Sequence, residues 1–547
     1  MKAGKKTINA ILLAAILAAY LFFVSNQTFL KKAFAYFGEH GGIVSLFFIT
    51  AIFLALVAVF VGLLSFKYTL KPAAMFLIVS GASAGYFVDQ YGVVINKAMI
   101  GSIVATTPQE AGEHISTELI GWLALTALLP CLLLLCIRVD YGKGWRALRA
   151  RAAIVVVSAI LTGAIVLANY SAFASTMRNH TDLMKSLNPA KPILSTARHF
   201  LHQARDARRT LTRIGTDAHR VSRSGPTAKP RVTVIVAGET ARAKSFSLNG
   251  YDRQTNPELK ARKVLNFSNV SSCGTHTGVS LPCMFSVFDR SEFREGKARY
   301  TENLLDVVQR AGIKVKWWDN NTSSAKVANR VPFESVYHIH EPPFCGKQGC
   351  FDEILVSRLA NHLANLKDDA VLVLHAIGSH GPAYFRRVPT KFKRFQPACE
   401  TATLSQCTRQ EIINAYDNTI FYTDHVLSRI IDVLDSTSNR FDTAMIYMSD
   451  HGESTGEFGL YLHGMPYSLA PREQTWVPFV MWISDGLSHS AEIDMECMAS
   501  RQRDALSHDN LFHSVLGLMD VVTTVYAPDL DIFSTCRSKT SARITRR

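Results

Sequence analysis

The sequence predicts two domains of different class, an N-terminal all-α membrane bundle of five transmembrane helices and a C-terminal α/β domain with disulfides. Hydrophobic residues make up 48% of the 547 residues, mean hydropathy is +0.10, and the apolar stretches concentrate before Tyr170. After Arg231, apolar runs of strand length alternate with helical stretches, which indicates a largely parallel sheet covered by helices. Most of the ten cysteines follow Tyr170, which indicates an oxidising compartment for that half.

Five apolar stretches of the first half are long enough, or nearly so, to cross about 30 Å of hydrocarbon. They are residues 8–24, 43–66, 72–95, 117–136 and 152–169. The first could be a signal peptide, but it lacks a small-residue cleavage site and further spans follow, so we interpret it as a retained helix. Asp89 and Glu118 fall within or at the edge of these spans. Intramembrane carboxylates are often functional, but we favour an interfacial position for both.

The basic residues of the short loops give the orientation of the bundle. One side carries Lys2, Lys5, Lys6, Lys67, Lys71, Arg138, Lys143, Arg146, Arg149 and Arg151, and the other carries Lys31, Lys32 and Lys97. With the N-terminus inside, an odd number of spans delivers everything after Tyr170 to the outside, in agreement with the cysteines. The predicted organisation is a transmembrane domain of residues 1–170, a linker of residues 171–230 and an outer domain of residues 231–547.

The formal net charge of +15 indicates an anionic partner, either nucleic acid or a membrane surface. Zinc-finger spacing, RNP patterns and helix-turn-helix cues are absent from the sequence, so we expect membrane lipids and no nucleic acid. In the linker, Pro189 and Pro192 break the chain early, and residues 198–213 then form a basic amphipathic helix. Such a helix lies on anionic headgroups or is an ordinary solvated linker. Residues 222–230 (SRSGPTAKP) are a hinge by composition.

The cysteines of the second half fall into near neighbours along the chain. These are Cys273 with Cys283, Cys345 with Cys350 and Cys399 with Cys407, while Cys497 and Cys536 are left over. Local disulfides are the simplest framework, although a sequence cannot fix connectivity. A zinc cluster is the alternative, but no CxxC pair with a second partner pair is present. Cys131 and Cys136 lie in an apolar run and are expected to be free thiols.

The elements of the outer domain follow from its alternating pattern. We expect strands at residues 232–237, 313–318, 370–375, 443–448 and 477–483, and helices at residues 301–311, 351–366, 409–434 and 509–521. Polar side chains follow four of these strands: Glu239, then Asp319, Asn320 and Asn321, then His375 and His380, then Asp450 and His451. In open α/β sheets, ligands bind beyond the carboxyl ends of the strands, so the sequence predicts a functional site there.

A loop at residues 272–284 (SCGTHTGVSLPCM) is expected to carry the reactive group. Thr277 lies where a glycine-bearing loop enters a helix, facing unpaired N–H groups that favour a phosphoryl group. Glu239, Asp450 and His451 supply oxygen and nitrogen ligands suited to zinc, with Thr277 as the fourth ligand. A bound divalent ion lowers the pKa of an attached hydroxyl, which would make Thr277 a nucleophile.

Two further histidines lie in polar segments of the same half. His380 and His463 are expected to contact a phosphate or to deliver a proton to the leaving group. The alternative for both is a supporting or helix-capping role.

Several long motifs resemble the membrane-anchored phosphoethanolamine transferases, which modify lipid A and include the mobile colistin-resistance enzymes. They are GETARAKSFSLNGYDRQTNP at residues 238–257, SSCGTHTGVSLPCMFS at 271–286, SHGPAYF at 379–385, INAYDNTI at 413–420 and SDHGESTGEFGLYLHGMP at 449–466. The resemblance covers the whole chain. It implies five spans, a linker, and a catalytic domain of alkaline phosphatase/sulfatase-like type.

The resemblance also implies a site and a reaction. Zn²⁺ would be held by Glu239, Thr277, Asp450 and His451, and Thr277 would form a phosphoethanolamine adduct. Donor contacts would come from Asn321, His380 and His463. The family usually has a lysine four residues after that asparagine, where this chain has Ala325, so Lys326 is expected to serve instead.

The reaction implied is transfer from phosphatidylethanolamine to a lipid A phosphate, conferring polymyxin resistance. The enzyme would be a monomer of the bacterial inner membrane with its catalytic domain in the periplasm. Three alternatives stay open. They are a phosphodiesterase or sulfatase that uses water, a phosphoethanolamine or glycerol-phosphate transferase acting on a core sugar or other glycan, and a scaffold without catalysis.

Overall fold

The computed structural model describes residues 7–38, 42–106, 108–180, 183–206, 210–221, 229–337, 339, 341–346 and 349–537. Lys2, Lys5, Lys6, Arg208 and Arg209 lie outside these residues, as does most of the expected hinge. The chain divides into two compact units. One comprises Met1–Ile100 with Ile115–Leu201, and the other comprises Gly101–His114 with His202–Arg547.

The first unit is helical. Its helices are α1 (Ala10–Val24), α2 (Gln27–Gly38), α3 (Gly42–Val59) with a π-helical turn (Phe60–Leu64), α4 (Leu70–Tyr91), α7 (Thr117–Leu123), a second π-helical turn (Ala124–Leu128), α8 (Leu129–Cys136), α9 (Gly144–Ala168) and α10 (Tyr170–Asn179). Helices α5 (Lys97–Ala105) and α11 (Ala190–Asp206) cross the boundaries between the units, and α6 (Pro108–Glu113) lies in the second. Strands β1 (Thr7–Asn9) and β2 (Arg138–Asp140) pair in parallel.

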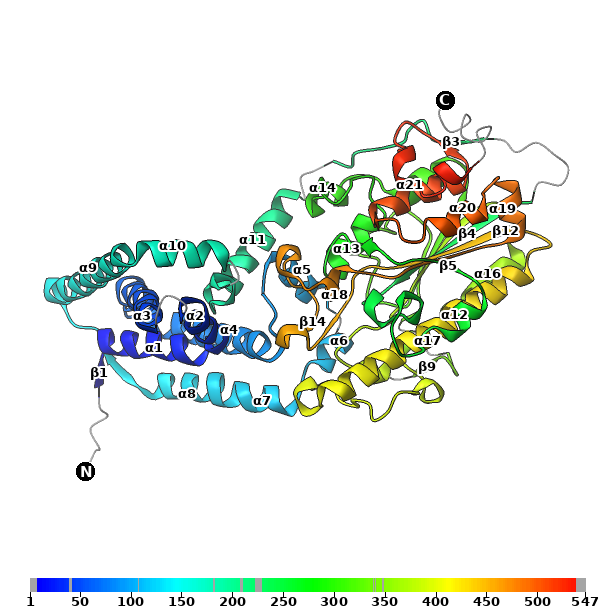
Figure 1. The fold of residues 1–547 in the computed structure, drawn as a ribbon. Coiled ribbons are helices and arrows are strands. Elements are labelled where there is room, and N and C mark those ends of the chain that lie inside the picture. Colours follow the sequence, from blue (N-terminus) through cyan, green and yellow to red (C-terminus); the bar gives the residue numbers. More distant parts are fainter. Residues whose placement is uncertain are drawn as a thin grey trace. The chain divides into compact units, whose positions relative to one another are not determined.

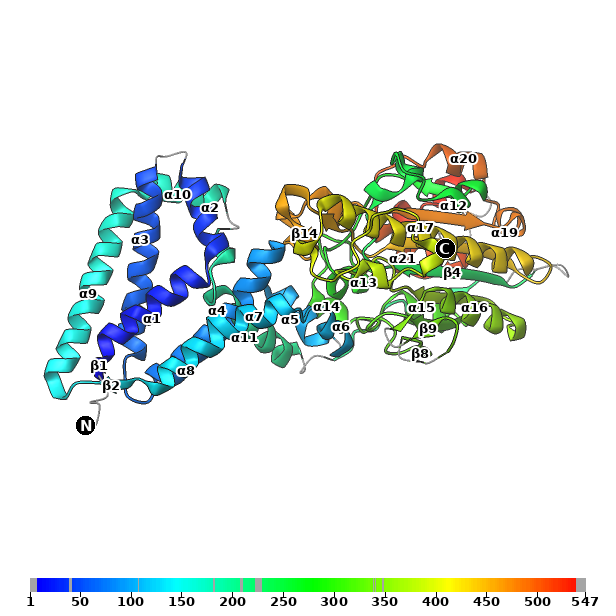
Figure 2. The ribbon, with the colours of Figure 1, turned by 90° about the horizontal axis from the view of Figure 1, so that it is seen from below.

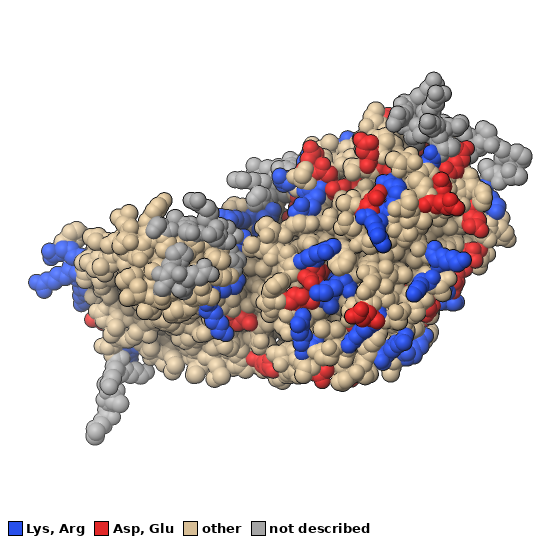
Figure 3. Space-filling view, viewed as in Figure 1, with Lys and Arg blue, Asp and Glu red and all other residues tan. Residues whose placement is uncertain are grey.

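Four continuous helical segments of this unit are long and apolar enough to cross a membrane. They are Gly42–Leu64, Leu70–Tyr91, Thr117–Cys136 and Gly144–Ala168. A fifth span results if Ala10–Val24 and Gln27–Phe37, which are bent by 73°, count as one. Figure 3 shows the surface of this unit largely free of charged side chains, which gather near its ends. The predicted membrane bundle is therefore present.

Hydrogen bonds explain the bend between α1 and α2 and the position of the Asp89 carboxylate. Asn26, in the break between α1 and α2, donates to the carbonyl of Asn188 at 2.8 Å and accepts from its N–H at 2.7 Å. Asp89 accepts from the N–H and hydroxyl of Thr28 at 3.0 and 2.6 Å, so it binds an otherwise unpaired N–H in the first turn of α2. Figure 2 shows α3 and α9 lying side by side in this unit.

The linker helix differs from the expectation. Helix α11 begins before Pro192, which lies in its first turn, where the missing N–H costs nothing. By Thr212 the chain is extended, because Thr212 donates its N–H to the carbonyl of Tyr300 at 2.7 Å and forms a bridge with Thr301. The expected helix to residue 213 therefore ends earlier, since the pairing of Thr212 with Tyr300 and Thr301 competes with helix formation.

The second unit is built on a seven-stranded sheet of order β5-β15-β12-β4-β11-β7-β8. Its strands are β4 (Arg231–Gly238), β5 (Leu265–Phe267), β7 (Lys314–Asp319), β8 (Phe333–Ser335), β11 (Ala370–His375), β12 (Asp442–Ser449) and β15 (Phe479–Ile483). Strand β15 runs antiparallel to both of its neighbours, β12 and β5, and the other six strands of the sheet run in one direction. All five predicted strands are present, and the short edge strands β5 and β8 were not predicted.

Helices cover both faces of the sheet (Figure 1). One layer contains α12 (Pro257–Ala261), α16 (Glu353–Asn365) and α17 (Arg409–Ser436), and the other contains α13 (Thr277–Met284), α15 (Leu304–Arg310) and α21 (Asp509–Leu518). Smaller helices are α14 (Glu295–Arg299), α18 (Arg472–Thr475), α19 (Asp485–Ser490) and α20 (Met495–Ser500). Strand β4 is fully buried at the centre, and the four predicted helices correspond to α15, α16, α17 and α21.

Short two-stranded pairings complete the unit. They join β3 (His219–Arg220) with β17 (Val521–Val522), β6 (Val270–Ser271) with β16 (Leu506–Ser507), β9 (Cys345–Gly346) with β10 (Gly349–Cys350) and β13 (Ser454–Thr455) with β14 (Tyr461–Leu462). Four disulfides join Cys273 to Cys283, Cys345 to Cys350, Cys399 to Cys407 and Cys497 to Cys536. The last pair closes a separation of 39 residues that the sequence left open, and Cys131 and Cys136 are free.

Candidate active site

Two neighbouring strands of the sheet bring three potential metal ligands together. Strands β4 and β12 pair in parallel with Ser449 opposite Gly238, so the residues that follow them leave the sheet at the same level. The N–H of Asp450 donates to the carbonyl of Gly238 at 2.9 Å, which holds the two chain ends together. Glu239, Asp450 and His451, here called the open cluster, are buried with ligand atoms all within 4.8 Å of one another.

Thr277 adds a fourth group to the open cluster. Its hydroxyl lies 3.1 and 3.3 Å from the two carboxylate oxygens of Glu239 and 3.4 Å from His451 Nε2. His451 Nε2 is also 3.4 Å from Glu239 Oε1 and from Asp450 Oδ2. Ligands of a tetrahedral zinc ion with bonds of about 2.0–2.1 Å stand about 3.3 Å apart, so these separations suit such an ion.

The hydrogen bonds within the open cluster favour a cation at its centre. His451 Nδ1 lies 2.8 Å from the carbonyl of Gly452, so it carries the proton and leaves the Nε2 lone pair facing the carboxylates. Asp450 Oδ2 is buried and has no hydrogen-bond partner within the described part of the chain. Lone pairs that face one another in a buried site need a cation or shared protons between them. The donor set therefore fits a divalent ion.

The electrostatics of the open cluster point the same way. Burial raises the pKa of Asp450, and the charge of Glu239 raises it further. Burial opposes the charge of Glu239, but hydrogen bonds from His380 and His451 outweigh it and hold the pKa of Glu239 well below its usual value. Burial lowers the pKa of His451, yet the two carboxylates raise it to about 9. Excess negative charge at this point binds a proton, and a metal ion would replace it.

The loop before α13 fixes the position of Thr277. A Cβ on Gly274 would lie 2.8 Å from Val279 Cγ1, so only glycine allows the loop to approach its own helix this closely. Thr275 donates its hydroxyl to the carbonyl of Met465 at 2.6 Å, and the Cys273–Cys283 disulfide ties the loop to α13. Thr277 is the first residue of that helix. Its oxygen therefore lies beside N–H groups left unpaired at a helix N-terminus, which favour anions.

His380 and His463 lie beside the open cluster. His380 Nδ1 is 3.4 Å from Glu239 Oε1, and the ring of His463 is 4.3 Å from that of His451 and 6.2 Å from that of His380. His463 Nδ1 lies 3.4 Å from Glu453 Oε2, a carboxylate that is itself buried. Both imidazole rings thus lie next to residues of the open cluster. Their roles stay predictions.

Asn321 supports Glu239 from beneath. Its amide nitrogen donates to Glu239 Oε2 at 2.9 Å and to the carbonyl of Ala376 at 3.1 Å, and the side chain is buried. The structure thus brings Asn321 to the site, in contact with a carboxylate of the open cluster. Whether it also contacts a substrate stays a prediction.

A second group of polar side chains lies behind Asn321 and is here called the closed cluster: Asp319, His375 and Trp317. Asp319 Oδ2 accepts from His375 Nδ1 and from Trp317 Nε1, both at 2.9 Å, and Oδ1 accepts from the N–H of Asn321 at 3.0 Å. His375 Nε2 is 3.4 Å from the Asn321 amide nitrogen. Burial lowers the pKa of His375, but the charge of Asp319 outweighs this and raises it.

Lys326 lies in a separate cleft. The cleft is lined by Gly278, which follows Thr277, and by Glu295, Arg299, Lys326 and Arg330. Lys326 and Ala325 both have positive φ angles, 73° and 45°, so the chain turns sharply here. The described residues that line this cleft include none of the open cluster, and the part of Lys326 in substrate binding stays a prediction.

Sequence reasoning missed three contacts of the site. Thr240, with φ 58°, donates its hydroxyl to Glu239 and its N–H to Asp450 Oδ1 at 3.1 Å. Glu453 is the partner of His463, and Ser102 lies beside Gly278, since its Oγ is 4.0 Å from a Cβ built there. Thr240 and Glu453 stand within the polar segments after β4 and β12, so proximity in sequence could have found them. Ser102 comes from a distant segment and gave no such signal.

Comparison with known families matches two parts of the chain. Residues 52–204 match the family described as phosphoethanolamine transferase EptA/EptB, and residues 231–521 match the sulfatase family. The phosphoethanolamine transferase EptA of Escherichia coli K12 is 40% identical over 475 residues, covering 86% of this chain and 87% of the relative. The phosphatidylethanolamine transferase Mcr-1 of Escherichia coli is 35% identical, covering 94% and 96%.

A solved structure resembles the whole chain. The integral membrane protein lipooligosaccharide phosphoethanolamine transferase A from Neisseria meningitidis matches with a TM-score of 0.93 and 33% identity, covering 97% of this chain and all of that one. Together with the apolar helices, this shows a multi-pass membrane protein with a sulfatase-like domain.

Proposed function

Because the chain belongs to the EptA/EptB family of phosphoethanolamine transferases, we propose that it transfers phosphoethanolamine from phosphatidylethanolamine to a phosphate of lipid A. The observation that carries the proposal is the position of the Thr277 hydroxyl, 3.1 Å from Glu239 Oε2 and 3.4 Å from His451 Nε2. The catalytic domain works in the periplasm, on the outer side of the inner membrane, where its four disulfides persist.

The cofactor proposed is Zn²⁺, held by Glu239, Thr277, Asp450 and His451. When bound, the ion lowers the pKa of the Thr277 hydroxyl and offsets negative charge on the phosphoryl oxygens. Asp450 Oδ2, which is buried without a hydrogen-bond partner among the described residues, and His451 Nε2, which faces the two carboxylates, support this assignment. Asn321 and Thr240 orient the Glu239 carboxylate.

In the first step, Thr277 Oγ1 attacks the phosphorus of phosphatidylethanolamine. A bond forms between Oγ1 and phosphorus, and the bond from phosphorus to the glycerol oxygen breaks. Glu239, the acceptor of the Thr277 hydroxyl, is placed to take its proton. His380 or His463 protonates the glycerol oxygen, so diacylglycerol leaves and phosphoethanolamine stays on Thr277.

In the second step, a phosphate oxygen of lipid A attacks the same phosphorus. The bond to Thr277 Oγ1 breaks, the threonine recovers a proton, and a diphosphate linkage forms on the acceptor. The N-terminus of α13 and the nearby histidines stabilise the charge on the phosphoryl oxygens in both steps. The transferred ethanolamine adds an ammonium group to lipid A, which weakens binding of cationic polymyxins and makes the cell resistant.

Mass spectrometry of the purified chain after incubation with phosphatidylethanolamine tests the first step. We expect an added phosphoethanolamine on Thr277 and none in Thr277→Ala, and a Thr277→Ala chain that still turns over donor would exclude the mechanism. Mass spectrometry of lipid A from cells with and without the chain tests the acceptor. Modification of a core sugar instead, or release of free phosphoethanolamine to water, would favour the alternative transferase or hydrolase. Light scattering of the purified chain tests the expected monomer.

A further inference from the structure

The β13–β14 hairpin links the open cluster to His463 and carries an unusual tip. Strand β13 follows the ligand His451 by three residues, and β14 ends directly before His463. Between them, Gly456–Leu460 form a turn closed by the N–H of Gly456, which donates to the carbonyl of Leu460 at 2.9 Å. A surface that binds this turn would therefore also influence the positions of His451 and His463, which flank the hairpin in sequence.

Phe458, at the tip of the hairpin, combines an exposed side chain with a strained backbone. Its side chain is 90% exposed, whereas Phe333 and Leu211 of the same unit are 46% and 42% exposed. Its backbone adopts φ 53° and ψ 26°, a left-handed conformation that costs a non-glycine residue about 1–2 kcal/mol. The described fold gives this aromatic ring little burial, so an occupant outside the fold that covered the ring would stabilise the turn.

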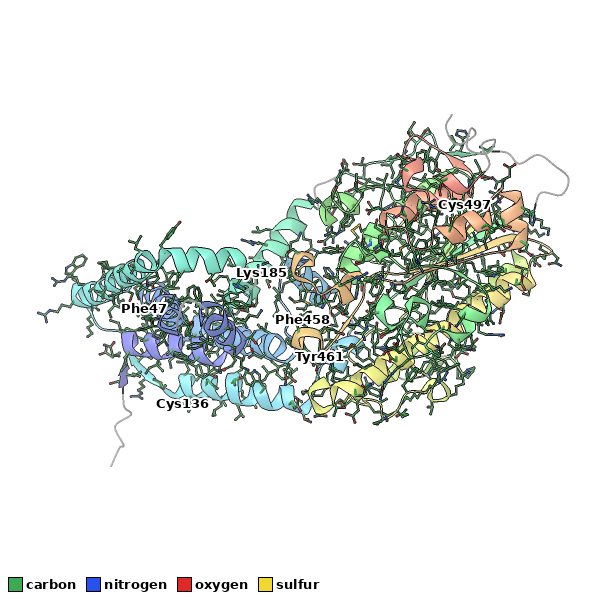
Figure 4. The ribbon with its side chains drawn as sticks, viewed as in Figure 1. Phe47, Cys136, Lys185, Phe458, Tyr461 and Cys497 are labelled. Atoms are coloured by element: carbon green, nitrogen blue, oxygen red, sulfur yellow. A yellow bond between two sulfur atoms is a disulfide. The ribbon has the colours of Figure 1, made fainter. Side chains whose placement is uncertain are left out.

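The base of the turn is rigid and basic. Glu457 is buried and accepts from Arg242 at 2.9 Å and from the N–H of Thr455 at 2.7 Å, which fastens the tip to the domain. Lys244 and Arg409 lie 4.0 and 3.9 Å from Glu457, with side chains 48% and 57% exposed. A Cβ on Gly456 would stand 3.0 Å from Arg409 Nε and 3.1 Å from the Tyr461 hydroxyl, so both groups lie against the turn. Figure 4 labels Phe458 and Tyr461 on this hairpin.

We propose that this hairpin docks the catalytic domain onto the bilayer, with Phe458 entering the lipid interface and Arg409 and Lys244 contacting lipid phosphates. An aromatic ring beside a tyrosine and two exposed cations suits the boundary between headgroups and acyl chains. Lys244 already pairs with Glu473 at 2.7 Å, so Arg409 is the cation more open to a lipid phosphate, and bare hydrocarbon would offer it none. The inference rests on the proposed function, because a phospholipid donor presents its phosphorus at that depth and His463 must reach it there.

Photocrosslinking in the intact chain tests the docking. The full chain carrying p-benzoylphenylalanine at position 458 is reconstituted in vesicles of phosphatidylethanolamine and phosphatidylglycerol and irradiated. We expect lipid adducts on the peptide that contains residue 458. The matched control carries the same group at position 333, a partly exposed phenylalanine of the edge strand β8, and should give none. Crosslinks from position 458 to peptides of residues 7–201, or equal lipid labelling at both positions, would overturn the proposal.

Kinetics with two forms of donor give an independent test. For Phe458→Ser, we expect the apparent KM for vesicle donor to rise about tenfold, from loss of about half the burial of a phenylalanine. Its activity on a short-chain, monomeric phosphatidylethanolamine should match that of the wild type, and Phe458→Trp should retain the vesicle KM. Phe333→Ser should change neither the KM for vesicle donor nor the activity on monomeric donor. Equal loss on both donors would show that Phe458 acts in the site and would overturn docking.

The two proposals fail separately. Adducts at position 458 need no turnover, so docking is tested even if the chain uses another acceptor or mechanism. Loading of Thr277 is measured in the same vesicle samples by mass spectrometry. Lipid adducts at position 458, together with a wild-type chain that never carries phosphoethanolamine, would exclude the proposed function while supporting docking.

Discussion

The open and closed clusters use the same residue types at the ends of neighbouring strands, yet their hydrogen bonding differs. In the closed cluster, Asp319 accepts three hydrogen bonds from His375, Trp317 and Asn321. In the open cluster, Asp450 Oδ2 has no partner among the described residues, and His451 Nε2 faces it at 3.4 Å. An Asp–His pair thus serves as a structural support where protein donors bond the carboxylate fully, and it is suited to hold a metal ion where unpaired lone pairs converge.

Removal of the Thr277 hydroxyl, the proposed nucleophile, should give the largest loss of activity. A small loss would contradict the difference drawn between the two clusters. Thr277→Val deletes the hydroxyl at constant volume, so we expect kcat to fall by about 10⁴-fold or more. Thr275→Val in the same loop loses a hydrogen bond to Met465 worth about 1 kcal/mol and should retain most activity. Turnover of phosphatidylethanolamine measures both. Equal losses in the two variants would mean that loop integrity, not the Thr277 oxygen, limits the reaction.

Exchange of one aspartate in each cluster should separate metal binding from stability. Asp450→Asn removes a ligand charge, and we expect zinc measured by mass spectrometry to be lost on dialysis. Asp319→Asn replaces one of the two acceptor oxygens by an NH2 donor, so at least one of the three buried donors that face Asp319 loses its acceptor. This variant should keep zinc, but its free energy of unfolding should fall by about 2–4 kcal/mol. Zinc loss in Asp319→Asn with an unchanged Tm would contradict the distinction between the clusters.

The flanking histidine should matter for the reaction but not for the metal. His463→Gln keeps a polar side chain and removes the proton donor, and we expect kcat to fall about 100-fold with zinc retained. A pre-steady-state measurement should show that loading of Thr277 slows, since protonation of the diacylglycerol oxygen belongs to the first step. Loss of zinc in this variant would instead place His463 among the ligands.

Loss of the Asn321 side chain, which lies between the two clusters, should have a smaller effect. Asn321→Ala removes the hydrogen bond that orients Glu239, and we expect zinc affinity to fall about tenfold to 100-fold. Asn320 is the matched control, because its amide donates to Asp352 at 2.8 Å and to the carbonyl of Cys350, away from the ligands. Competition with a zinc chelator measures both variants, and an equal effect of Asn320→Ala would remove the bridging role.

The smallest effect concerns His513, a buried histidine of helix α21. Burial lowers the pKa of His513 to about 4, and its Nδ1 accepts from the N–H of Ala527 at 3.0 Å. The folded pKa is below the unfolded value of about 6.5, so the fold loses stability as pH falls below 6.5, by up to about 1.4 kcal/mol per pH unit. Thermal unfolding between pH 7.5 and 5.5 should show a weaker pH dependence in His513→Gln than in the wild type, and an equal pH dependence in the two chains would contradict the expectation.

Much of the fold could be predicted because the apolar pattern is local. The strands at β4 and β12 and the helices α16 and α17 follow from runs of residues that bury one face or both. Glu239, Asp450 and His451 were recognisable since they follow parallel strands directly, and the ends of such strands meet at one edge. Three disulfides joined cysteines at most ten residues apart, where proximity in sequence already implies proximity in space.

Tertiary structure alone decided the rest, because those features depend on partners distant in sequence. The sequence placed Asp319 and His375 at the same edge as the ligands and could not tell that one pair would be saturated. It left Cys497 and Cys536 unassigned across 39 residues, and it could not show that Asn321 lies against Glu239. The exposed tip at Phe458 was equally hidden, since a residue's exposure depends on what the whole chain packs around it. Local patterns determine elements and ligand types, whereas long-range packing decides which polar groups are satisfied and which are left to bind.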